Sequence, residues 1–325
     1  MADTYLITGG TGSFGHAFVR HLLSDSTTGR VVVLSRDELK QAQMRVEFPD
    51  KRMRFFIGSV TDPERVGLAM RGIDYVIHAA AMKRVETCEE NPHEAFTVNT
   101  YGTQVVARAA LLAGVKRALF LSTDKAVEPN TMYGTTKLSA ERLWTASNVY
   151  AAGTDTRYAA TRYGNVLGSR GSVVGFWRGQ ADRGESLSVT DPDMTRFWMT
   201  IDNAVALIAM ALREMRGGEV FIPKVGASNL MTLARATTQD ADSFVGLGWQ
   251  RVGTRPGEKM HEALIGVEEA RSAYEYDEHY RIEPHARTWE DNVQELGAPV
   301  PEGFSYRSDT TPHQLTVEQL REMLP

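Results

Sequence analysis

The feature that most constrains the fold of this chain is an alternation, through its first half, of short apolar runs with longer helical stretches. The apolar runs are rich in β-branched residues, and several are nearly continuous, as expected for parallel strands that are buried on both faces. Strands are predicted over 5–8, 30–34, 53–57, 75–78, 117–122 and 157–162, and helices over 13–23, 63–70, 92–113 and 133–150. This order predicts an α/β fold built on a doubly wound parallel sheet.

The alternation ends near Arg162, which is the best candidate for a domain boundary. The following residues, 163–200, are rich in glycine, arginine and polar side chains. Further along, the sequence predicts a helix over 201–215, a strand over 219–222, an irregular stretch to Gln250, and a final helix over 316–324 whose TVEQ start resembles a capping box. No internal repeat and no low-complexity segment accompanies this change of pattern.

Composition argues against nucleic acid or a membrane as a partner. Lysine and arginine number 36 against 41 acidic residues, which gives a formal charge of -5 and no reason to expect a basic surface. No apolar run approaches the roughly 20 residues of a membrane span, and the start MADTYLITGG leads directly into a strand without a signal-like leader. The single cysteine, Cys88, fits a reducing compartment, so we expect a cytoplasmic protein.

Neither Cys88 nor the histidines indicate chemistry of their own. No partner for a nucleophilic thiol is evident, so Cys88 is predicted to be a buried, small apolar residue. The 8 histidines show no zinc-binding spacing, and no metal is predicted.

The glycines at positions 9, 12 and 15 predict a dinucleotide-binding loop. They follow the first predicted strand and precede the first predicted helix, where glycine permits a tight turn, close approach of a pyrophosphate, and close packing of helix on strand. The helix N-terminus adds unpaired N–H groups. An ordinary strand-to-helix turn is the alternative, but the position of the loop favours a Rossmann-like fold. The cofactor contacts expected here are Gly9, Thr11, Gly12, Ser13, Phe14 and Gly15.

The end of the second strand predicts which dinucleotide binds. Ser35 and Arg36 stand where NAD-specific proteins usually carry an acidic residue, and both can hydrogen-bond a 2′-phosphate. NADP is therefore favoured over NAD, although Asp37 keeps NAD open. A capping box from Ser35 to Glu38 is the structural alternative, and one residue can serve both purposes.

Two further segments are predicted to meet the cofactor. Asp62 is placed either to meet an adenine amino group or to cap the helix that begins at Pro63. The small residues Ala79 and Ala80, after the fourth strand, would let a ribose lie against the backbone.

The pair Tyr133 and Lys137 predicts proton transfer. The two residues are four apart, so they lie on one face of a helix. A tyrosine has a usual pKa of about 10 and is a poor base near neutrality. A nearby ammonium or a nicotinamide cation would lower that pKa. An exposed helical pair is the alternative, but the position after the fifth strand favours catalysis.

With these motifs the sequence resembles the extended short-chain dehydrogenase/reductases. Within that superfamily it is similar to the inverting, 5-epimerising UDP-N-acetylglucosamine 4,6-dehydratases of flagellin-glycan and capsule pathways. The segments that carry this likeness are SRDELKQ (35–41), AAAMKRVETCEENP (79–92), STDKAVEPNTMYGTTK (122–137), RYGNVLGSRGSVV (162–174) and RPGEKMHE (255–262), and PEGFSYRSD and TVEQLREML also fit. The likeness therefore covers nearly the whole chain.

The resemblance implies NADP-dependent removal of water from UDP-N-acetylglucosamine, or from a closely related UDP-hexosamine, with inversion at carbon 5. The implied catalytic residues are Thr123, Asp124, Lys125, Tyr133 and Lys137. Lys125 is assigned as the base at carbon 5 and Asp124 as the acid at carbon 6. Burial favours the neutral amine and the protonated acid that these roles need, whereas mutual attraction favours the charged pair. The balance stays open, and one proton shared by the pair is a third possibility.

The resemblance also implies the substrate contacts and the domains. Lys83 and Asn99 are candidates near the cofactor, Lys83 for either ligand, and Asn99 either shapes the site or bonds backbone. The implied substrate contacts are Lys83, Asn165, Arg170, Ser172, Arg196, Arg255 and Glu258, with a structural ion pair as the alternative for each arginine. The expected domains are an NADP-binding Rossmann domain over 1–165, rejoined by a segment near 200–223, a smaller nucleotide-sugar domain over 166–266, and a C-terminal extension over 267–325 packed on the body.

Two other functions are open at this point. A UDP-sugar 4-epimerase would also use Tyr133 and Lys137 but would not need the Asp124–Lys125 pair. A catalytically silent NADP-sensing regulator would need only the glycine loop. A homo-oligomer is expected because relatives are commonly oligomers.

Overall fold

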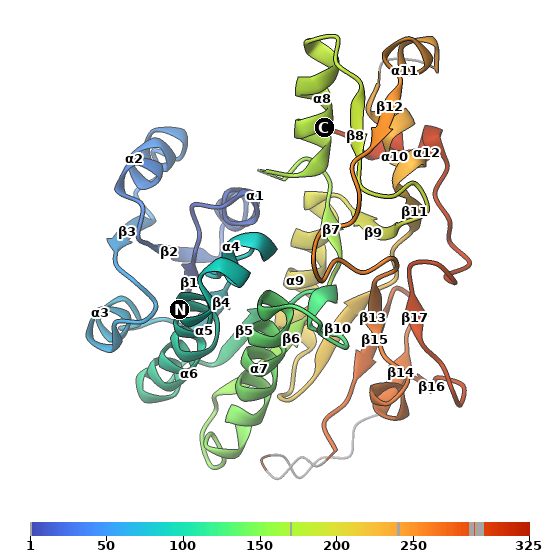
Figure 1. Ribbon diagram of the computed structural model, residues 1–325. Helices are drawn as coiled ribbons and strands as arrows, with labels where there is room; N and C mark the ends of the chain where they lie inside the picture. The colour runs from blue at the N-terminus through green and yellow to red at the C-terminus, as the bar shows by residue number, and fades with distance from the viewer. Residues whose placement is uncertain (1, 170, 239–240, 286–288, 290–295) are drawn as a thin grey trace.

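The computed structural model describes residues 2–169, 171–238, 241–285, 289 and 296–325. Their largest sheet has ten strands in the order β16-β14-β15-β10-β6-β5-β4-β1-β2-β3 (Figure 1). The strands are β1 (Asp3–Thr8), β2 (Thr28–Ser35), β3 (Met53–Ile57), β4 (Tyr75–His78), β5 (Arg117–Leu121), β6 (Arg157–Thr161), β10 (Val220–Pro223), β14 (Ala273–Glu275), β15 (His279–Ile282) and β16 (Ala298–Pro299). Those from β3 to β10 are parallel, whereas β15, β14 and β16 add antiparallel pairs at one edge. The predicted Rossmann-like fold is confirmed.

Helices cover both faces of this sheet, because successive strand residues are apolar on both sides. Leu6 of β1 belongs to one hydrophobic cluster and its neighbour Ile7 to the other. The first face is covered by α3 (Pro63–Ala69), α6 (Gly102–Ala113) and α7 (Met132–Ala146), and the second by α1 (Ser13–Ser24) and α9 (Ile201–Glu214). A strand that is buried on both faces reads as a continuous apolar run, as the sequence showed.

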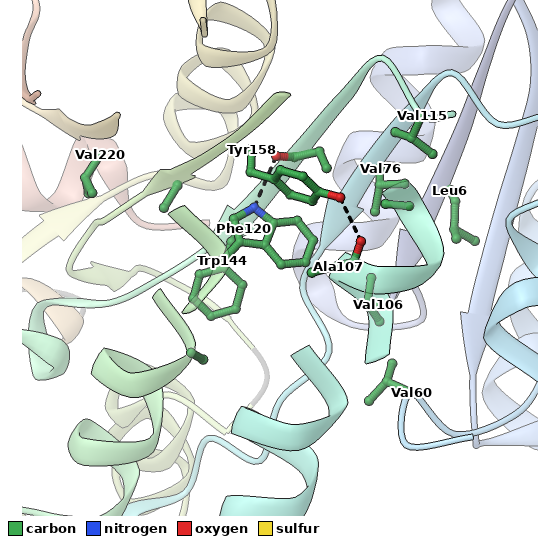
Figure 2. Close-up of a cluster of buried hydrophobic side chains, with 14 of the residues drawn as sticks. Leu6, Val60, Val76, Val106, Ala107, Val115, Phe120, Trp144, Tyr158 and Val220 are labelled. Carbon is green, nitrogen blue, oxygen red and sulfur yellow. Dashed lines mark hydrogen bonds between the residues drawn. The ribbon is translucent and has the colours of Figure 1, made fainter. Parts of the chain in front are cut away.

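Two aromatic side chains fasten helices to the first face (Figure 2). The indole of Trp144, on α7, donates a hydrogen bond to the carbonyl of Ala118 in β5 at 3.2 Å. The hydroxyl of Tyr158, on β6, donates to the carbonyl of Ala107 in α6 at 2.7 Å, and the two rings meet edge to face. These bonds fix α7, which carries the Tyr133–Lys137 pair, relative to the strand ends.

A smaller part of the structure, at the upper right of Figure 1, contains most of the segment from 165 to 265 and the end of the chain. Its elements are β7 (Asn165–Val166), α8 (Val173–Asp182), β8 (Leu187–Val189), β9 (Thr195–Met199), β11 (Ala227–Asn229), α10 (Leu230–Thr237), α11 (Ala241–Leu247), β12 (Trp249–Arg251) and α12 (Val317–Met323). Trp177, Trp198, Leu233 and Leu320 belong to its hydrophobic core. Nearby, β13 (Ala263–Ile265) pairs with β17 (Tyr306–Arg307).

The predicted elements are largely present, but several elements of the structure differ from the prediction. The stretch from Glu219 to Gln250, expected to become irregular after its strand, contains α10 and α11. Asn229 caps α10 by accepting a hydrogen bond from the Thr232 N–H at 2.8 Å. The helix is so short that its apolar residues do not form a clear helical repeat in the sequence. The sequence reading also gave no helix for α2 (Glu38–Glu47). The predicted helix over 92–113 is divided into α5 (Pro92–Phe96), a π-helical turn (Thr97–Tyr101) and α6.

Several smaller expectations can be checked as well. The capping box at the start of α12 is confirmed, with Thr316 and Gln319 bonded reciprocally. The segment near 200–223 contributes α9 and β10 to the main fold, and β14, β15 and β16 of the expected C-terminal extension continue its sheet. The domain boundaries at 165 and 266 stay predictions. Within the described residues, every helix is too short or too polar to cross a bilayer.

Candidate active site

A cleft of about 2040 Å³ lies between the carboxyl ends of the parallel strands and the smaller part of the structure. Sites for one drug-sized ligand usually measure about 300–1,000 Å³, so this cleft has room for a cofactor and a substrate together. The predicted site residues that line it are Gly9, Thr11, Gly12, Ser13, Phe14, Gly15, Ser35, Arg36, Ala79, Ala80, Lys83, Thr123, Asp124, Lys125, Tyr133, Lys137, Asn165, Ser172, Arg196, Arg255 and Glu258. Asp62 and Asn99 do not line it, and Arg170 lies outside the described residues.

The glycine loop forms a cradle that fits a pyrophosphate. Gly9 has a φ of 66°, and a Cβ there would lie 2.8 Å from Ala80 Cα. A Cβ at Gly15 would lie 2.0 Å from the carbonyl oxygen of Gly10, so only glycine allows α1 to pack so closely on the loop. Gly12 caps α1 without a side-chain bond, and the first turn of α1 contains no acidic residue. The N-terminal end of α1, with the positive end of its helix dipole, therefore faces the cleft.

At the outer end of the cradle, Ser35 is held in place while Arg36 stays exposed. Thr11 Oγ1 donates a hydrogen bond to Ser35 Oγ at 3.2 Å, and Gln41 Nε2 donates to the Ser35 carbonyl at 3.0 Å. The alternative interpretation, a capping box from Ser35 to Glu38, is wrong, because α2 begins at Glu38 and its cap is Asp37. The Asp37 carboxylate accepts from the Lys40 N–H at 2.9 Å, which ties this acidic group to its own helix.

Asp62 and Asn99 have structural roles in this state, and their cofactor contacts stay predictions. Asp62 caps α3 by accepting a hydrogen bond from the Arg65 N–H at 3.0 Å, and the cleft is lined instead by Gly58, Ser59 and Val60. Asn99 is buried on the π-helical turn, where it accepts from the Met82 N–H at 2.8 Å and donates to the Met82 carbonyl at 3.0 Å. Each residue forms the backbone hydrogen bonds that the sequence had left open as its structural alternative. Asn99 fixes the backbone between Ala80 and Lys83.

The tyrosine side of the cleft consists of Tyr133 and Lys137, both on α7. Lys137 Nζ donates a hydrogen bond to the Leu121 carbonyl at 2.6 Å and lies 3.9 Å from the centre of the Phe120 ring. Burial lowers the pKa of Lys137 to about 7. Burial also raises the pKa of Tyr133 to about 12, against the opposing effect of the Lys125 ammonium. The phenol is therefore protonated in this state, and stabilisation of its phenolate by Lys137 stays a prediction.

The carboxylate side consists of Asp124, Lys125 and Glu262. Thr123 lies two residues beyond the end of β5 and caps a single 3-10 turn over Asp124–Ala126. Asp124 Oδ1 accepts hydrogen bonds from Thr123 Oγ1 at 2.9 Å and from Lys125 Nζ at 3.1 Å, and Glu262 Oε1 lies 3.4 Å from the same nitrogen. Burial favours the neutral amine, but Asp124 and Glu262 outweigh it and raise the pKa of Lys125 above its usual value. Lys125 is therefore an ammonium in this state.

The predicted substrate contacts converge from segments that are far apart in the sequence. Arg196 of β9 is buried, and its Nη2 lies 3.3 Å from Glu258 Oε1. Glu258 in turn accepts from the Arg255 N–H at 3.1 Å. Asn165 Oδ1 is buried without a hydrogen-bond partner in the described part of the chain. Ser172 caps α8 without a side-chain bond. This arrangement suits a ligand with several acceptor oxygens and donor hydroxyls.

Two residues of this region were quoted within the motif RPGEKMHE but given no role. They are Glu262, whose side chain is 3% exposed, and Lys259, which donates to the Val127 carbonyl at 2.5 Å. Both line the cleft. Lys259 and Glu262 are three residues apart and follow Arg255 and Glu258, which could have indicated a role in the same site. Spacing alone does not reveal that they approach Lys125.

The residues outside the cleft agree with their structural interpretations. Cys88 is fully buried and packs with Tyr133 and Ala95, and burial raises the pKa of its thiol to about 11. The partly buried Tyr280 packs against Phe304 and Tyr306.

The fold and the site together define a class of protein. A glycine cradle at the first strand–helix junction and a Tyr133–Lys137 pair after the fifth strand are the features of a short-chain dehydrogenase/reductase-type protein. The chain belongs to the polysaccharide biosynthesis protein family, whose model matches residues 5–284. The predicted fold, the predicted resemblance and the prediction that this chain is an enzyme of this family are confirmed.

Two curated relatives match this chain over nearly its full length. A UDP-N-acetylglucosamine 4,6-dehydratase (inverting) from Campylobacter jejuni subsp. jejuni serotype O:23/36 (strain 81-176) is 41% identical over 327 residues, which cover 98% of this chain and 96% of the relative. A UDP-glucose 4-epimerase from Rickettsia canadensis (strain McKiel) is 36% identical over 327 residues, which cover 99% and 95%.

Two solved structures have the same architecture. Pen from Bacillus thuringiensis superposes with a TM-score of 0.88 at 35% identity and covers 99% of this chain and 98% of its own. DesIV, a dTDP-glucose 4,6-dehydratase from Streptomyces venezuelae with NAD and TYD bound, superposes with a TM-score of 0.70 at 25% identity and covers 79% and 86%.

Proposed function

We propose that this protein catalyses the NADP-dependent dehydration of UDP-N-acetylglucosamine to a UDP-4-keto-6-deoxy-N-acetylhexosamine, with inversion at carbon 5. The observation that carries the proposal is the hydrogen-bonded Asp124–Lys125 pair, which lies in the same cleft as Tyr133. Oxidation at carbon 4 needs only a tyrosine and a dinucleotide. Elimination of water across carbons 5 and 6 also needs an acid and a base, and this pair supplies both. The similarity to the Campylobacter jejuni dehydratase over 98% of the chain supports the same reaction.

The cradle around Gly12 supports a nicotinamide dinucleotide, and the NAD bound to DesIV supports the same class of cofactor. When bound, the nicotinamide would accept the hydride of carbon 4 and return it to carbon 6. NADP is proposed over NAD because Ser35 and Arg36 line the outer end of the cleft while Asp37 is occupied in capping α2. Arg36 lies 3.7 Å from Glu94, and its side chain is 61% exposed, so it is free to turn toward a 2′-phosphate.

The cofactor preference can be tested by binding alone. Arg36→Asp should weaken NADP⁺ by about 10- to 100-fold, as expected for the loss of a charged hydrogen bond, and should leave NAD⁺ affinity equal or better. Calorimetric titration of both cofactors measures this ratio. Arg71→Asp is the matched control, because Arg71 is exposed and does not line the cleft. Unchanged NADP⁺ affinity in Arg36→Asp would refute the phosphate contact.

On the tyrosine side, Tyr133 would take the proton of the carbon 4 hydroxyl. The phenol must first lose its own proton, and burial opposes this by raising the pKa of Tyr133 to about 12. The ammonium of Lys125 and a hydrogen bond between the Tyr133 and Thr123 side chains act in the other direction. A cationic ring bound beside the phenol would add to these effects. Lys137 would hold its place through the Leu121 carbonyl and carry the lost proton onward, since its pKa of about 7 suits proton exchange at neutral pH.

On the carboxylate side, one proton transfer would prepare both catalytic groups. Lys125 begins as an ammonium and Asp124 as a carboxylate, 3.1 Å apart. Passage of a proton from Lys125 to Asp124 would give a neutral amine that can take the carbon 5 proton. It would also give an acid that can protonate the leaving hydroxyl at carbon 6. Release of water would return Asp124 to a carboxylate and leave Lys125 protonated.

The proton count of this scheme closes within the site. The sugar gives up one proton from the carbon 4 hydroxyl and one from carbon 5, and it takes up one on the leaving hydroxyl and one on carbon 5. Inversion requires the proton that carbon 5 takes up to arrive from the face opposite the one that carbon 5 lost. Elimination has by then already returned the Asp124–Lys125 pair to its starting state, so the proton held by Tyr133, passed to the opposite face of carbon 5, would close the count and return Tyr133 to a phenolate.

The nucleotide end of the substrate would lie against cations from both parts of the structure. Lys83, Arg196 and Arg255 line that region of the cleft, and a diphosphate is the ligand that such cations recognise. The unpartnered Asn165 Oδ1 is a ready acceptor for a sugar hydroxyl or an amide N–H.

The function is tested by incubating the protein, loaded with NADP⁺, with UDP-N-acetylglucosamine in deuterated water. Mass spectrometry and NMR should show the loss of one water, a 4-keto-6-deoxy sugar, deuterium at carbon 5 and inversion there. Reduced cofactor should not accumulate. Failure to form a dehydrated sugar would contradict the proposal, and retention at carbon 5 would contradict the role of Lys125.

A UDP-sugar 4-epimerase is the second candidate. The Rickettsia canadensis epimerase, 36% identical over 99% of this chain, favours it. The same experiment separates the two, because an epimerase would yield an isomer of unchanged elemental composition.

A further inference from the structure

Glu262 is fixed at a place from which its carboxylate reaches the catalytic lysine. It precedes β13, and its backbone is held on both sides by Ser308. The Glu262 N–H donates to Ser308 Oγ at 2.9 Å, and the Ser308 N–H donates to the Glu262 carbonyl at 2.8 Å. The side chain is 3% exposed and lines the cleft. The backbone thus gives this buried acid little freedom to turn away from its neighbours.

The contacts of the Glu262 carboxylate are unusually sparse for a buried acid. Oε1 forms an ion pair with Lys125 Nζ at 3.4 Å. Oε2 lies 3.9 Å from Lys259 Nζ and has no hydrogen-bond partner among the described residues. A buried carboxylate that lacks hydrogen bonds destabilises the folded state, and such groups occur mainly at functional sites, where their charge contributes to the chemistry.

We propose that Glu262 is a positioning residue of the catalytic centre, which holds the Lys125 ammonium beside Asp124 so that this pair enters the reaction with one shared proton. The catalytic part of this inference rests on the function proposed above. The contact itself does not. Two carboxylates and one ammonium carry a net charge of -1, and the shift of one proton from Lys125 to Asp124 leaves that charge unchanged. The internal transfer therefore needs no compensating movement of charge.

The remaining groups around Lys125 fix the sign of the effect. Asp124 and Glu262 favour its ammonium form, and the Tyr133 phenolate would add to them, whereas the cations Arg196 and Lys259 oppose them. Loss of the Glu262 charge removes one of the two nearest anions and leaves both opposing cations in place. The pKa of Lys125 should then fall.

The contact is tested without substrate, through the reaction of lysine amines with acetic anhydride. Only the neutral amine reacts, so the pH profile of labelling at Lys125, measured by peptide mass spectrometry, reports its protonation. In the wild type, labelling of Lys125 should still rise at pH values where that of the exposed Lys51 has levelled off. In Glu262→Gln the profile should move to lower pH, with about tenfold faster labelling at neutral pH for each unit of pKa. Glu262→Asp keeps the charge and should keep the wild-type profile.

Two results would overturn the inference. One is a Glu262→Gln profile at Lys125 that superimposes on the wild type. The other is a wild-type profile in which Lys125 levels off no later than Lys51, and this second result decides the matter even if the Gln variant does not fold. Glu268→Gln is the matched control, since Glu268 is 84% exposed and pairs with Arg271 on the surface.

Kinetics then connect the contact to catalysis. Glu262→Gln should lower kcat for UDP-N-acetylglucosamine more than it changes KM, and should move the alkaline limb of the kcat profile to lower pH, by about one pH unit per unit of Lys125 pKa. Glu262→Asp should restore the wild-type limb. An unmoved limb in Glu262→Gln would contradict the catalytic role. If the wild type labels as expected but does not dehydrate the sugar, the proposed function fails while the Glu262 contact stands.

Discussion

The tyrosine side and the carboxylate side of the cleft each contain a lysine, yet they treat its charge in opposite ways. Lys137 meets a backbone carbonyl and an aromatic ring, and its pKa is lowered to about 7. Lys125 meets two carboxylates, and its pKa is raised. The two residues are only twelve positions apart in the sequence and line the same cleft.

This difference teaches that residue type alone does not fix a role in acid–base chemistry. Neutral dipoles near Lys137 cannot replace the water that it loses on burial, so its proton is easily released. The anions near Lys125 stabilise its ammonium by more than burial destabilises it, so Lys125 keeps its proton until a partner takes it. One site can therefore contain a lysine that exchanges its proton near neutral pH, Lys137, and a lysine that keeps its proton there, Lys125.

The largest effect is expected from the tyrosine side. Tyr133→Phe removes the group that takes the carbon 4 proton, and kcat should fall by about 10²- to 10⁴-fold, the range for loss of a general base. NADP⁺ affinity should stay the same within error, because the cradle around Gly12 is untouched. Steady-state kinetics and calorimetry measure the two quantities. Tyr150→Phe, at a residue that is 79% exposed, is the control and should match the wild type. Near-normal turnover in Tyr133→Phe would mean that the two sides are assigned wrongly.

A smaller effect is expected from Lys137→Met, which separates activity from stability. Turnover should fall by about 10²-fold, near the lower limit for proton-transfer groups. Stability at pH 7 should rise, with Tm higher by roughly 2–4 °C for each kcal/mol gained, because a buried cation is replaced by an apolar chain.

The pH dependence of this stability gain follows from the direction of the shift. Lys137 has a pKa of about 7 when folded, against a usual value of 10.5. Between these values unfolding takes up a proton, so the wild type gains stability as pH rises. The advantage of Lys137→Met should be largest at or below pH 7 and should vanish near pH 10. Thermal melts at several pH values measure it, and an advantage independent of pH would contradict the buried-cation account.

The residues that line the cofactor half of the cleft could be predicted largely from local patterns. Its determinants are local: a strand, three glycines at fixed spacing and a helix, with Tyr133 and Lys137 one helical turn apart. Such rules read directly from the sequence. Where two local rules competed, as at Asp62 and Asn99, the sequence left both open, and the structure shows that the side chain bonds backbone in each case.

The carboxylate side could be predicted only in part. The Asp124–Lys125 pair was recognised, but its protonation depends on Glu262, 137 residues further along the chain, whose approach is set by the pairing of β13 with β17 and by Ser308. No spacing rule links residues so far apart. For the same reason, Arg196 and Glu258 were both predicted as substrate contacts but not as an ion pair. The helix α10 was not predicted, because it is too short to show a clear helical repeat in the sequence.

The central claim is that the two sides perform separate steps, and Lys125→Ala tests it most directly. Rapid mixing of this variant, loaded with NADP⁺, with UDP-N-acetylglucosamine follows reduced nicotinamide by absorbance and dehydrated sugar by mass spectrometry. The account predicts that reduced cofactor accumulates, because carbon 4 is still oxidised, while no dehydrated sugar forms. Dehydration at a rate near that of the wild type, or the absence of any reduced cofactor, would contradict it.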